Sequence, residues 1–274
     1  MRVARFSAGG DPAYGLVELA SDGGKHPDTV AVISGDPLAT SVQFTGERHA
    51  LADVRLLAPV IPRSKVIAVG PNYVELARDL NQELTDTPLT FFKPNTAVIG
   101  PQEPIIYPDF SKEVGFEGEL AVVIGRICKE VPPERVQDVI FGYTIGNDVS
   151  ARDIQFNEAQ WARAKGFDTS CPLGPWITCH LTLEEAQNLT ITTTLDGEVY
   201  QNASTADMVH SIADLVSFIS SYTTLLPGDV LLTGTPGGVG LMNPGQTVSV
   251  SIEQIGTLTN PVIGSHDNPA GANQ

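Results

Sequence analysis

The sequence predicts a strand-rich α+β fold with few helices. Many short runs of apolar and β-branched residues are bounded by Gly, Asp and Pro, which is typical of strands joined by turns. Helix-like patterns are confined to a few segments, and they do not alternate with strands as in a doubly wound sheet. Hydrophobic residues make up 42% of the 274 residues, which is enough for a packed core.

We expect a small N-terminal domain, a main body and a tail. Residues 1–60 carry strand-like pieces at 3–6 and 29–33, and the punctuated connection LAPVIPRSK follows. The main body, 61–263, opens with a strand at 66–70. Further strands are expected at 97–99, 105–107, 119–124, 176–178, 190–194, 229–233 and 247–252. The tail, 264–274, lacks large apolar residues and is expected to be loose.

Helices are expected in three places. Pro132 and Pro133 can open one that runs to Val139, since Pro is favoured in the first helical turn. A second is expected at 153–164. The third, at 210–222, has the clearest pattern, an apolar stripe formed by Ile212, Leu215, Val216 and Ile219.

Net charge, hydropathy and cysteine content limit the partners and the compartment that we expect for this protein. The net charge of −16 argues against a nucleic-acid backbone or an anionic membrane surface. No apolar segment approaches the roughly 20 residues that span a bilayer, and the N-terminus lacks the apolar core of a signal peptide. The cysteines, Cys128, Cys171 and Cys179, are odd in number and widely spaced, so we expect reduced thiols in a cytoplasmic protein.

Three acidic residues present an electrostatic problem. Glu117 and Glu119 stand two apart in FEGELAVVIG, so they share one face of a strand that otherwise looks buried. A third acid, Asp148, follows another strand-like run. Together they would make an all-oxygen site suited to Mg²⁺, with no His or Cys placed to favour zinc. The alternative is an exposed strand face, with Asp148 capping the helix that follows.

Seven segments, in order from Lys65 to Val262, resemble the fumarylacetoacetate hydrolase family. They are VIAVGPNY, FFKPNTAVIGP, FEGELAVVIG, FGYTIGNDVSARDIQ, WARAKGFDTSCPLGPWI, LLPGDVLLTGTPGGVG and IGTLTNPV. The resemblance implies a compact roll of mixed β-structure with few helices. It also implies that Mg²⁺ or Mn²⁺ is bound by Glu117, Glu119 and Asp148. Members of this family are commonly homodimers, so we expect one here.

The resemblance implies a small anionic 2-oxo acid as the substrate, either a dicarboxylate or an acylpyruvate. A cation that polarises the 2-oxo group can serve hydrolysis of a C–C bond, decarboxylation and keto–enol isomerisation alike. The metal site cannot choose among these reactions. We expect C–C cleavage first and isomerisation second. A catalytically silent member that only binds a metal and a 2-oxo acid is the remaining alternative.

The family motifs also carry polar residues with expected roles. Lys165, in RAKGFDTS, matches a family lysine that reaches the metal-site chemistry, where its charge would offset developing negative charge. Arg152 would buttress the carboxylates, and Gln155 resembles a substrate-contacting position. Each of these can also be an ordinary polar residue near a helix end.

Further substrate contacts are expected from three other segments. The glycine-rich TGTPGGVG lacks the GK[ST] ending of a phosphate-binding loop, so we expect its Gly234 amide and Thr235 hydroxyl to hold a substrate carboxylate. It can also be a plain tight turn between strands. By resemblance, Tyr73 in GPNY and Lys93 in FFKPN belong to the pocket wall.

The chain departs from the family pattern in GPNYVELARDL. Many members carry a His at the position of Leu76, paired with an acid at the position of Asp79, and this pair activates water. Here Glu75 and Asp79 remain, four apart and so on one face if the segment is helical. They are the candidate catalytic acids. The missing His weakens the case for hydrolysis more than the case for decarboxylation, which needs no nucleophile.

Overall fold

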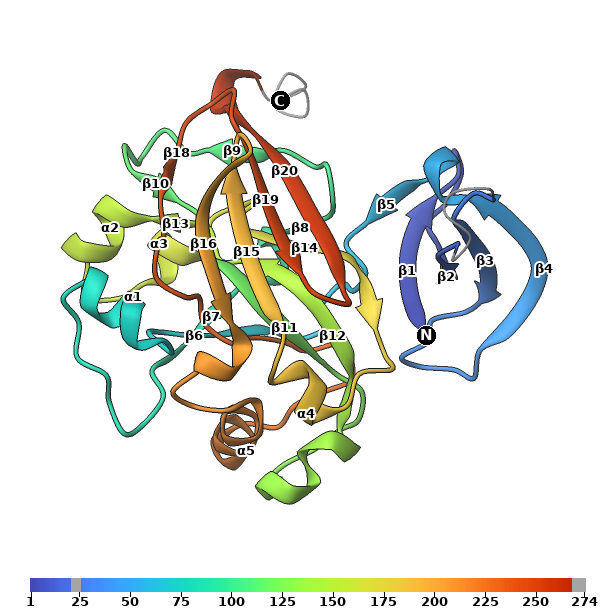
Figure 1. Ribbon diagram of the computed structural model, residues 1–274, viewed down its shortest axis with the longest axis horizontal. Helices are drawn as coiled ribbons and strands as arrows, with labels where there is room; N and C mark the ends of the chain where they lie inside the picture. Colours follow the sequence, from blue (N-terminus) through green and yellow to red (C-terminus); the bar gives the residue numbers. More distant parts are fainter. Residues whose placement is uncertain (21–25, 268–274) are drawn as a thin grey trace.

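The computed structural model describes residues 1–20 and 26–267, and it confirms a strand-rich fold with few helices. Figure 1 shows the first four strands as a small unit set to one side of a larger body. These strands are antiparallel neighbours in the order β4–β3–β2–β1. Their bounds are β1 Arg2–Ser7, β2 Ala13–Glu18, β3 Thr29–Ser34 and β4 Gln43–Ala50.

The N-terminal strands extend the main sheet of the body. β1 pairs antiparallel with β14 and with β5, and the sheet then continues β14–β12–β11–β17–β6–β7. β8 (Val98–Ile99) runs parallel to the start of β14. The other bounds are β5 Arg55–Leu57, β6 Val66–Val69, β7 Thr90–Lys93, β11 Gly118–Ile124, β12 Ile140–Asn147, β14 Cys171–Thr178 and β17 Val230–Leu232.

Two smaller sheets complete the body. Five strands in the order β16–β15–β19–β20–β9 pack against β11 and β12. Buried residues alternate with partly exposed ones along β15 and β19, so one face of this sheet meets the core. The third sheet is β13–β10–β18. The bounds are β9 Ile105–Tyr107, β10 Val114–Gly115, β13 Ser150–Ala151, β15 Thr190–Leu195, β16 Glu198–Ser204, β18 Leu241–Met242, β19 Thr247–Ile252 and β20 Gly256–Gly264.

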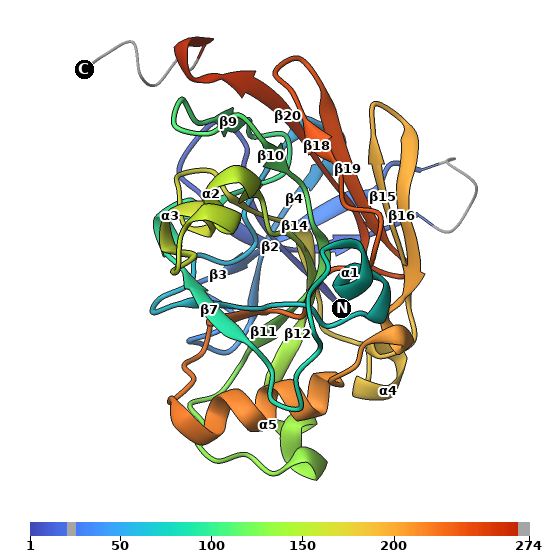
Figure 2. The ribbon, with the colours of Figure 1, turned by 90° about the vertical axis from the view of Figure 1, so that its left-hand side faces the viewer.

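Helices lie outside the sheets. The predicted stripe of α5 (Ile212–Tyr222) is buried as expected, and Ser211 and Asp214 cap its start reciprocally. Figure 2 shows α5 below the ends of β11 and β12. None of the helices among the described residues is long and apolar enough to span a membrane. The others are α1 Val74–Asp79, α2 Arg152–Asn157, α3 Ala162–Lys165 and α4 Leu183–Ala186, with 3-10 turns at Leu51–Asp53, Asn95–Ala97, Pro133–Asp138, Thr205–Asp207 and Ser265–Asp267.

The single helix predicted at 153–164 is wrong, because the chain forms two short helices there. Glu158 adopts an extended conformation after α2. The break lets Trp161 meet Phe91 of β7 edge to face, with ring centroids 5.3 Å apart. Tertiary packing therefore overrides the local helical pattern.

Other predicted elements differ at their ends. The helix expected to run to Val139 is a 3-10 helix at Pro133–Asp138. The strand expected at 97–99 begins at Val98, after a 3-10 turn. In the expected tail, β20 includes Gly264, and a 3-10 turn follows. Residues 268–274 lie outside the described part of the chain.

The two sheets pack tightly at Gly118, which predicts intolerance of even one methyl group. A Cβ on Gly118 would lie 2.2 Å from Thr193 Oγ1 and 2.9 Å from Val250 Cγ1. We expect Gly118→Ala to lower the free energy of unfolding by about 1–3 kcal/mol, through overpacking. Urea unfolding measures this. Gly10→Ala is the control, because a Cβ there meets nothing within 4 Å. Equal unfolding midpoints for the two variants would contradict the prediction.

Candidate metal centre

The pairing of β11 with β12 brings three acids together. Gly118 lies opposite Asn147, so Asp148, just beyond the end of β12, comes level with Glu117. The Asp148 amide donates to the Glu117 carbonyl (2.9 Å), and the Glu117 amide donates to Asn147 Oδ1 (2.9 Å). Glu119 follows on the same strand. Each of the three acids offers a carboxylate oxygen within 4.8 Å of the others.

These acids are buried, and so are the cations that pair with them. Arg152 lies 2.6 Å from one oxygen of Glu117, and Lys165 lies 2.7 Å from the other. Lys165 also reaches Asp148 at 2.8 Å, and Lys93 reaches its other oxygen at 2.5 Å. All five side chains are at most 7% exposed. Opposite charges within this distance compensate much of the cost of removing each group from water.

Asp148 shows the effect of this pairing most clearly. Burial by itself would raise the pKa of its carboxyl, but the charges and hydrogen bonds of Lys165 and Lys93 outweigh burial and lower that pKa. The alternative of an exposed acidic face is therefore wrong. The residue that precedes α2 is Ala151, so Asp148 does not cap this helix.

Glu119 is the acid without a cationic partner among the described residues. One of its oxygens accepts the Gly234 amide at 2.7 Å, and the other, though buried, has no hydrogen-bond partner. Burial raises the pKa of Glu119 well above its usual range, and the charges of Asp148 and Glu117 raise it further. An unpaired buried oxygen beside two more carboxylates fits a hard divalent cation, because Mg²⁺ and Mn²⁺ prefer oxygen ligands.

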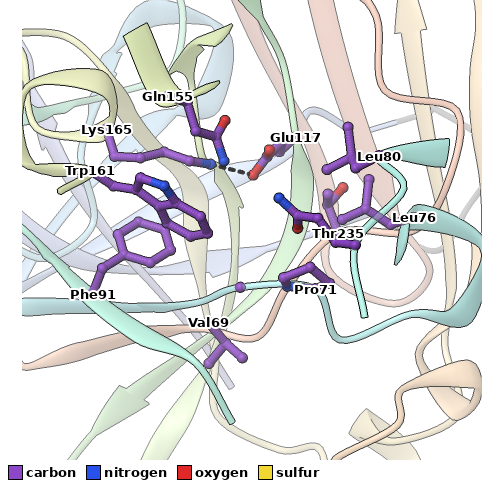
Figure 3. Close-up of a pocket in the computed structure, with 12 residues that line it drawn as sticks. Val69, Pro71, Leu76, Leu80, Phe91, Glu117, Gln155, Trp161, Lys165 and Thr235 are labelled. Atoms are coloured by element: carbon purple, nitrogen blue, oxygen red, sulfur yellow. Dashed lines mark hydrogen bonds and ion pairs between the residues drawn. The ribbon is translucent and has the colours of Figure 1, made fainter. Parts of the chain in front are cut away.

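A narrow pocket adjoins this cluster, as Figure 3 shows. Lys165 and Glu117 form its polar end, and Leu76 and Leu80 approach from the side opposite Trp161. In this conformation it encloses about 10 Å³, which is roughly the room that one water needs. Its lining consists of Val69, Gly70, Pro71, Leu76, Leu80, Gln82, Phe91, Glu117, Gln155, Trp161, Lys165 and Thr235.

Two aromatic residues of the pocket were not singled out from the sequence. Phe91 and Trp161 form one wall, and the Lys165 ammonium lies over the Phe91 ring, 5.3 Å from its centroid. A cation over a ring face is attracted to it, so Phe91 helps to hold Lys165 in place. Both aromatics lie in motifs that carried the resemblance, FFKPN and WARAKG. Their position in those motifs was the available signal.

The predicted substrate contacts divide into three groups. Gln155 and Thr235 line the pocket. Lys93 and Gly234 hold carboxylates of the cluster, with Lys93 on Asp148 and Gly234 on Glu119, and their contact with a substrate stays a prediction. Tyr73 is buried with no partner for its hydroxyl, and it lines a separate surface hollow.

Arg152 and Gln201 hold residues of the site in place through hydrogen bonds and an ion pair. Arg152 donates to Gln155 Oε1 at 3.0 Å as well as pairing with Glu117. Gln201, which the sequence did not suggest, donates to Thr235 Oγ1 at 2.7 Å and accepts the Gly118 amide at 3.1 Å. It therefore ties the glycine-rich turn to β11. Nothing in the local sequence distinguishes this glutamine from a surface residue of β16.

The Leu76 side chain of helix α1 lines the pocket, whereas the two acidic side chains of this helix do not. Leu76 is 4% exposed and forms part of the wall. Glu75 and Asp79 are exposed, and neither lines the pocket. Asp79 accepts the Gly238 amide at 3.1 Å, which fixes the helix to the glycine-rich turn. Their catalytic role stays a prediction.

Two family models match the chain. The model described as fumarylacetoacetate (FAA) hydrolase C-terminal matches residues 65–263, and the one described as Rv2993c-like, N-terminal, matches residues 1–59. Protein Rv2993c of Mycobacterium tuberculosis is 48% identical over 96% of this chain and 98% of its own length. The mitochondrial oxaloacetate tautomerase Fahd2a of Rattus norvegicus is 40% identical over 77% of this chain and 70% of its own length.

Solved structures agree with these matches. The 5-carboxymethyl-2-hydroxymuconate delta-isomerase from Mycobacterium smegmatis superposes with a TM-score of 0.87 and 47% identity, covering 97% of this chain and 100% of that one. The maleylpyruvate hydrolase from Sphingobium sp. SYK-6, solved in complex with manganese(II) and pyruvate, has a TM-score of 0.77 and 30% identity. The superposition covers 96% of this chain and 99% of the hydrolase chain.

Glu119→Gln should have opposite effects on the metal-free and metal-bound protein. Because folding raises the pKa of Glu119, its ionisation opposes folding above the usual Glu pKa of about 4.3. An amide removes that charge, so in EDTA the variant should melt higher than wild type. Wild type should gain about 2.7 kcal/mol at Mg²⁺ 100 times above its Kd, several degrees in Tm, and the variant should gain none.

Differential scanning calorimetry with EDTA and with Mg²⁺ or Mn²⁺ measures both effects. The exposed Glu184→Gln, on α4, is the matched control and should behave as wild type. An undiminished metal-induced shift in Glu119→Gln would remove Glu119 from the proposed ligand set.

Proposed function

The chain belongs to the fumarylacetoacetate hydrolase family, and from this premise we propose that it is a Mg²⁺- or Mn²⁺-dependent tautomerase or isomerase of a small 2-oxo acid. The resemblance drawn from the sequence motifs is thereby confirmed. The observation that carries the proposal is the composition of the pocket beside the carboxylates. Of the described residues lining it, only Glu117 and Lys165 are titratable, and they are paired with each other.

The metal assignment is supported by the donor set and by relatives. Glu117, Glu119 and Asp148 supply only oxygen atoms, and a relative of the same fold was solved with manganese(II) and pyruvate. When bound, a divalent cation polarises a 2-oxo group and stabilises an enolate. The proposed reaction moves one proton between C3 and an oxygen of the substrate, so it consumes no other reactant.

The polar end of the pocket suits the carboxylate and 2-oxo group of such a substrate. Lys165 lies on this end, and Gln155 and Thr235 line it with hydrogen-bonding groups. We place Lys165 as the group that transfers the proton at C3, because it is the one amino group among the described pocket-lining residues. As the ammonium it would give a proton to C3 of the enol form, and the neutral amine left behind would take the proton of the enol hydroxyl. Its position over Phe91 and between two carboxylates fixes the direction of the Nζ atom.

Hydrolysis has weaker support from this geometry. Leu76 stands where many relatives carry the water-activating His, and it is packed into the wall. Proton transfer needs no water as a reactant, so an apolar wall favours it. We therefore place isomerisation ahead of C–C cleavage. The relatives named tautomerase and isomerase agree with this order.

C–C cleavage is the second candidate, and one observation favours it. Glu75 and Asp79 remain on α1, and the room inside the pocket is too small for a substrate unless Leu76 and Leu80 move. If α1 moves to admit the substrate, its acids change position as well. Two solved relatives that are named as hydrolases also support C–C cleavage as a candidate reaction.

The experiment that tests the function follows the C3 proton and the C–C bond separately. Oxaloacetate, acetylpyruvate and fumarylpyruvate are incubated in D₂O with Mg²⁺ or Mn²⁺, and NMR records deuterium at C3 while lactate dehydrogenase detects released pyruvate. We expect metal-dependent exchange that outpaces pyruvate release. Lys165→Met should lower the exchange kcat about 10²- to 10⁴-fold. Lys129→Met, exposed and distant in sequence, should not.

Each other outcome has a clear meaning. Pyruvate release as fast as exchange would make the chain a cleaving enzyme. Metal and substrate binding without either reaction would make it the binding-only member. Full exchange in Lys165→Met would assign the proton transfer to another group.

Leu76→His should restore water activation. Histidine at this position lines the pocket, and its unperturbed pKa lies near neutrality. We expect acylpyruvate hydrolysis to rise about 10²-fold, the lower end for a positioned acid–base group, while C3 exchange changes much less. Leu76→Gln is the control for polarity without basicity. If both variants hydrolyse equally, the imidazole is not the cause.

A further inference from the structure

A second hollow continues the pocket away from the carboxylates. It is lined by Pro71, Gln82, Glu83, Thr85, Leu89 and Trp161, and its volume is about 220 Å³. Three of these residues, Pro71, Gln82 and Trp161, also line the inner pocket. Once Leu76 and Leu80 have moved to admit a substrate, a 2-oxo acid whose acid end faces Lys165 would extend its far end toward this outer hollow.

The outer hollow offers no cation to a second carboxylate. Among the described residues that line either space, the single cation is Lys165, which already lies 2.7 Å from Glu117 and 2.8 Å from Asp148. The one charged residue that lines the outer hollow is Glu83. A distal carboxylate would approach this like charge, which is unfavourable, and because Glu83 is exposed the repulsion is screened by salt.

The walls suit an apolar group instead. Leu76, Leu80 and Phe91 surround the inner part, and Trp161 with Leu89 continues the apolar surface outward. Apolar area removed from water stabilises the bound state in proportion to that area. A cavity of about 150 Å³ holds a benzene ring, so a hollow of about 220 Å³ has room for a phenyl group.

We infer that the preferred substrate is a 2-oxo acid with an uncharged, apolar distal group, such as an aromatic acylpyruvate, and that a distal carboxylate is disfavoured. This inference rests on the proposed function for the orientation of the substrate. Trp161, Leu89 and Glu83 are the residues that set the preference: the first two attract the apolar group, and the third repels a carboxylate.

The test compares benzoylpyruvate with fumarylpyruvate, which share the pyruvate end and differ at the far end. With saturating Mn²⁺, we expect kcat/KM for C3 exchange or cleavage to favour benzoylpyruvate by about 10- to 100-fold. Calorimetric Kd values for the two compounds should follow the same order, and they report the preference whether or not the chain turns the compounds over.

A charge reversal isolates the role of Glu83. Glu83→Lys should raise kcat/KM for fumarylpyruvate about 3- to 10-fold at low ionic strength, with a smaller effect in high salt, and should change kcat/KM for benzoylpyruvate by a smaller factor, so that the ratio of the two shifts toward fumarylpyruvate. Asp86→Lys makes the same change of charge three residues along, and Asp86 lines neither space. This control should leave the ratio of the two substrates as in wild type.

Three results would overturn the inference. They are equal or tighter binding of fumarylpyruvate by wild type, equal effects of Glu83→Lys and Asp86→Lys, and a preference unaffected by Trp161→Ala. Failure of the proposed function looks different, because neither compound, nor oxaloacetate, would then exchange its C3 protons or release pyruvate, while the two Kd values would still rank the distal groups.

Discussion

The site depends on one constraint: three carboxylates and three cations must share a space with almost no water. The register of β11 against β12 brings Asp148 level with Glu117. The backbone pairing therefore places these two acids side by side, independently of the cations that surround them. In a medium of low dielectric, each unpaired charge costs several kcal/mol. Lys93, Arg152 and Lys165 compensate two of the acids, and Glu119 is left with one amide. The surrounding sheets fix the positions of these charged groups.

The three acids lie on or beside the central strands, while the pocket wall beside them combines residues of strands and of short helices. The acids lie on and beside β11 and β12, and behind them Gly118 brings a second sheet into close contact. Gln201 links that sheet to the glycine-rich turn. The apolar wall comes instead from α1, from the segment after it, and from Trp161 before α3. The short helices α2 and α3 carry the charged Arg152 and Lys165, whereas α1 and the segment after it contribute only apolar and uncharged side chains to the pocket, so this last part of the wall can vary without disturbing the charges.

The anionic 2-oxo acid that we propose as substrate would approach a chain whose net charge is −16, so its binding would depend on the local potential. Inside the site, the cations are engaged with carboxylates, and a divalent ion bound by the acids would supply the excess positive charge. The outer hollow has no such source, and its single charged residue is negative. This contrast is the basis of our inference that the substrate binds by an anionic end and that an uncharged group is preferred at its other end.

The sequence by itself determined the strand-rich class, the stripe of α5, the family, and the three acids as a group, because strand alternation and ordered motifs are local signals. It pointed to Arg152 and Lys165 as cations near those acids, but it assigned Lys93 to the pocket wall and not to Asp148. Lys93, Arg152 and Lys165 come from separate segments, and Gly234 turned out to bind Glu119 by its amide. The break between α2 and α3 and the outward direction of Glu75 and Asp79 also followed from tertiary contacts. Strand register and side-chain direction depend on partners distant in sequence, and only the folded chain brings those partners together.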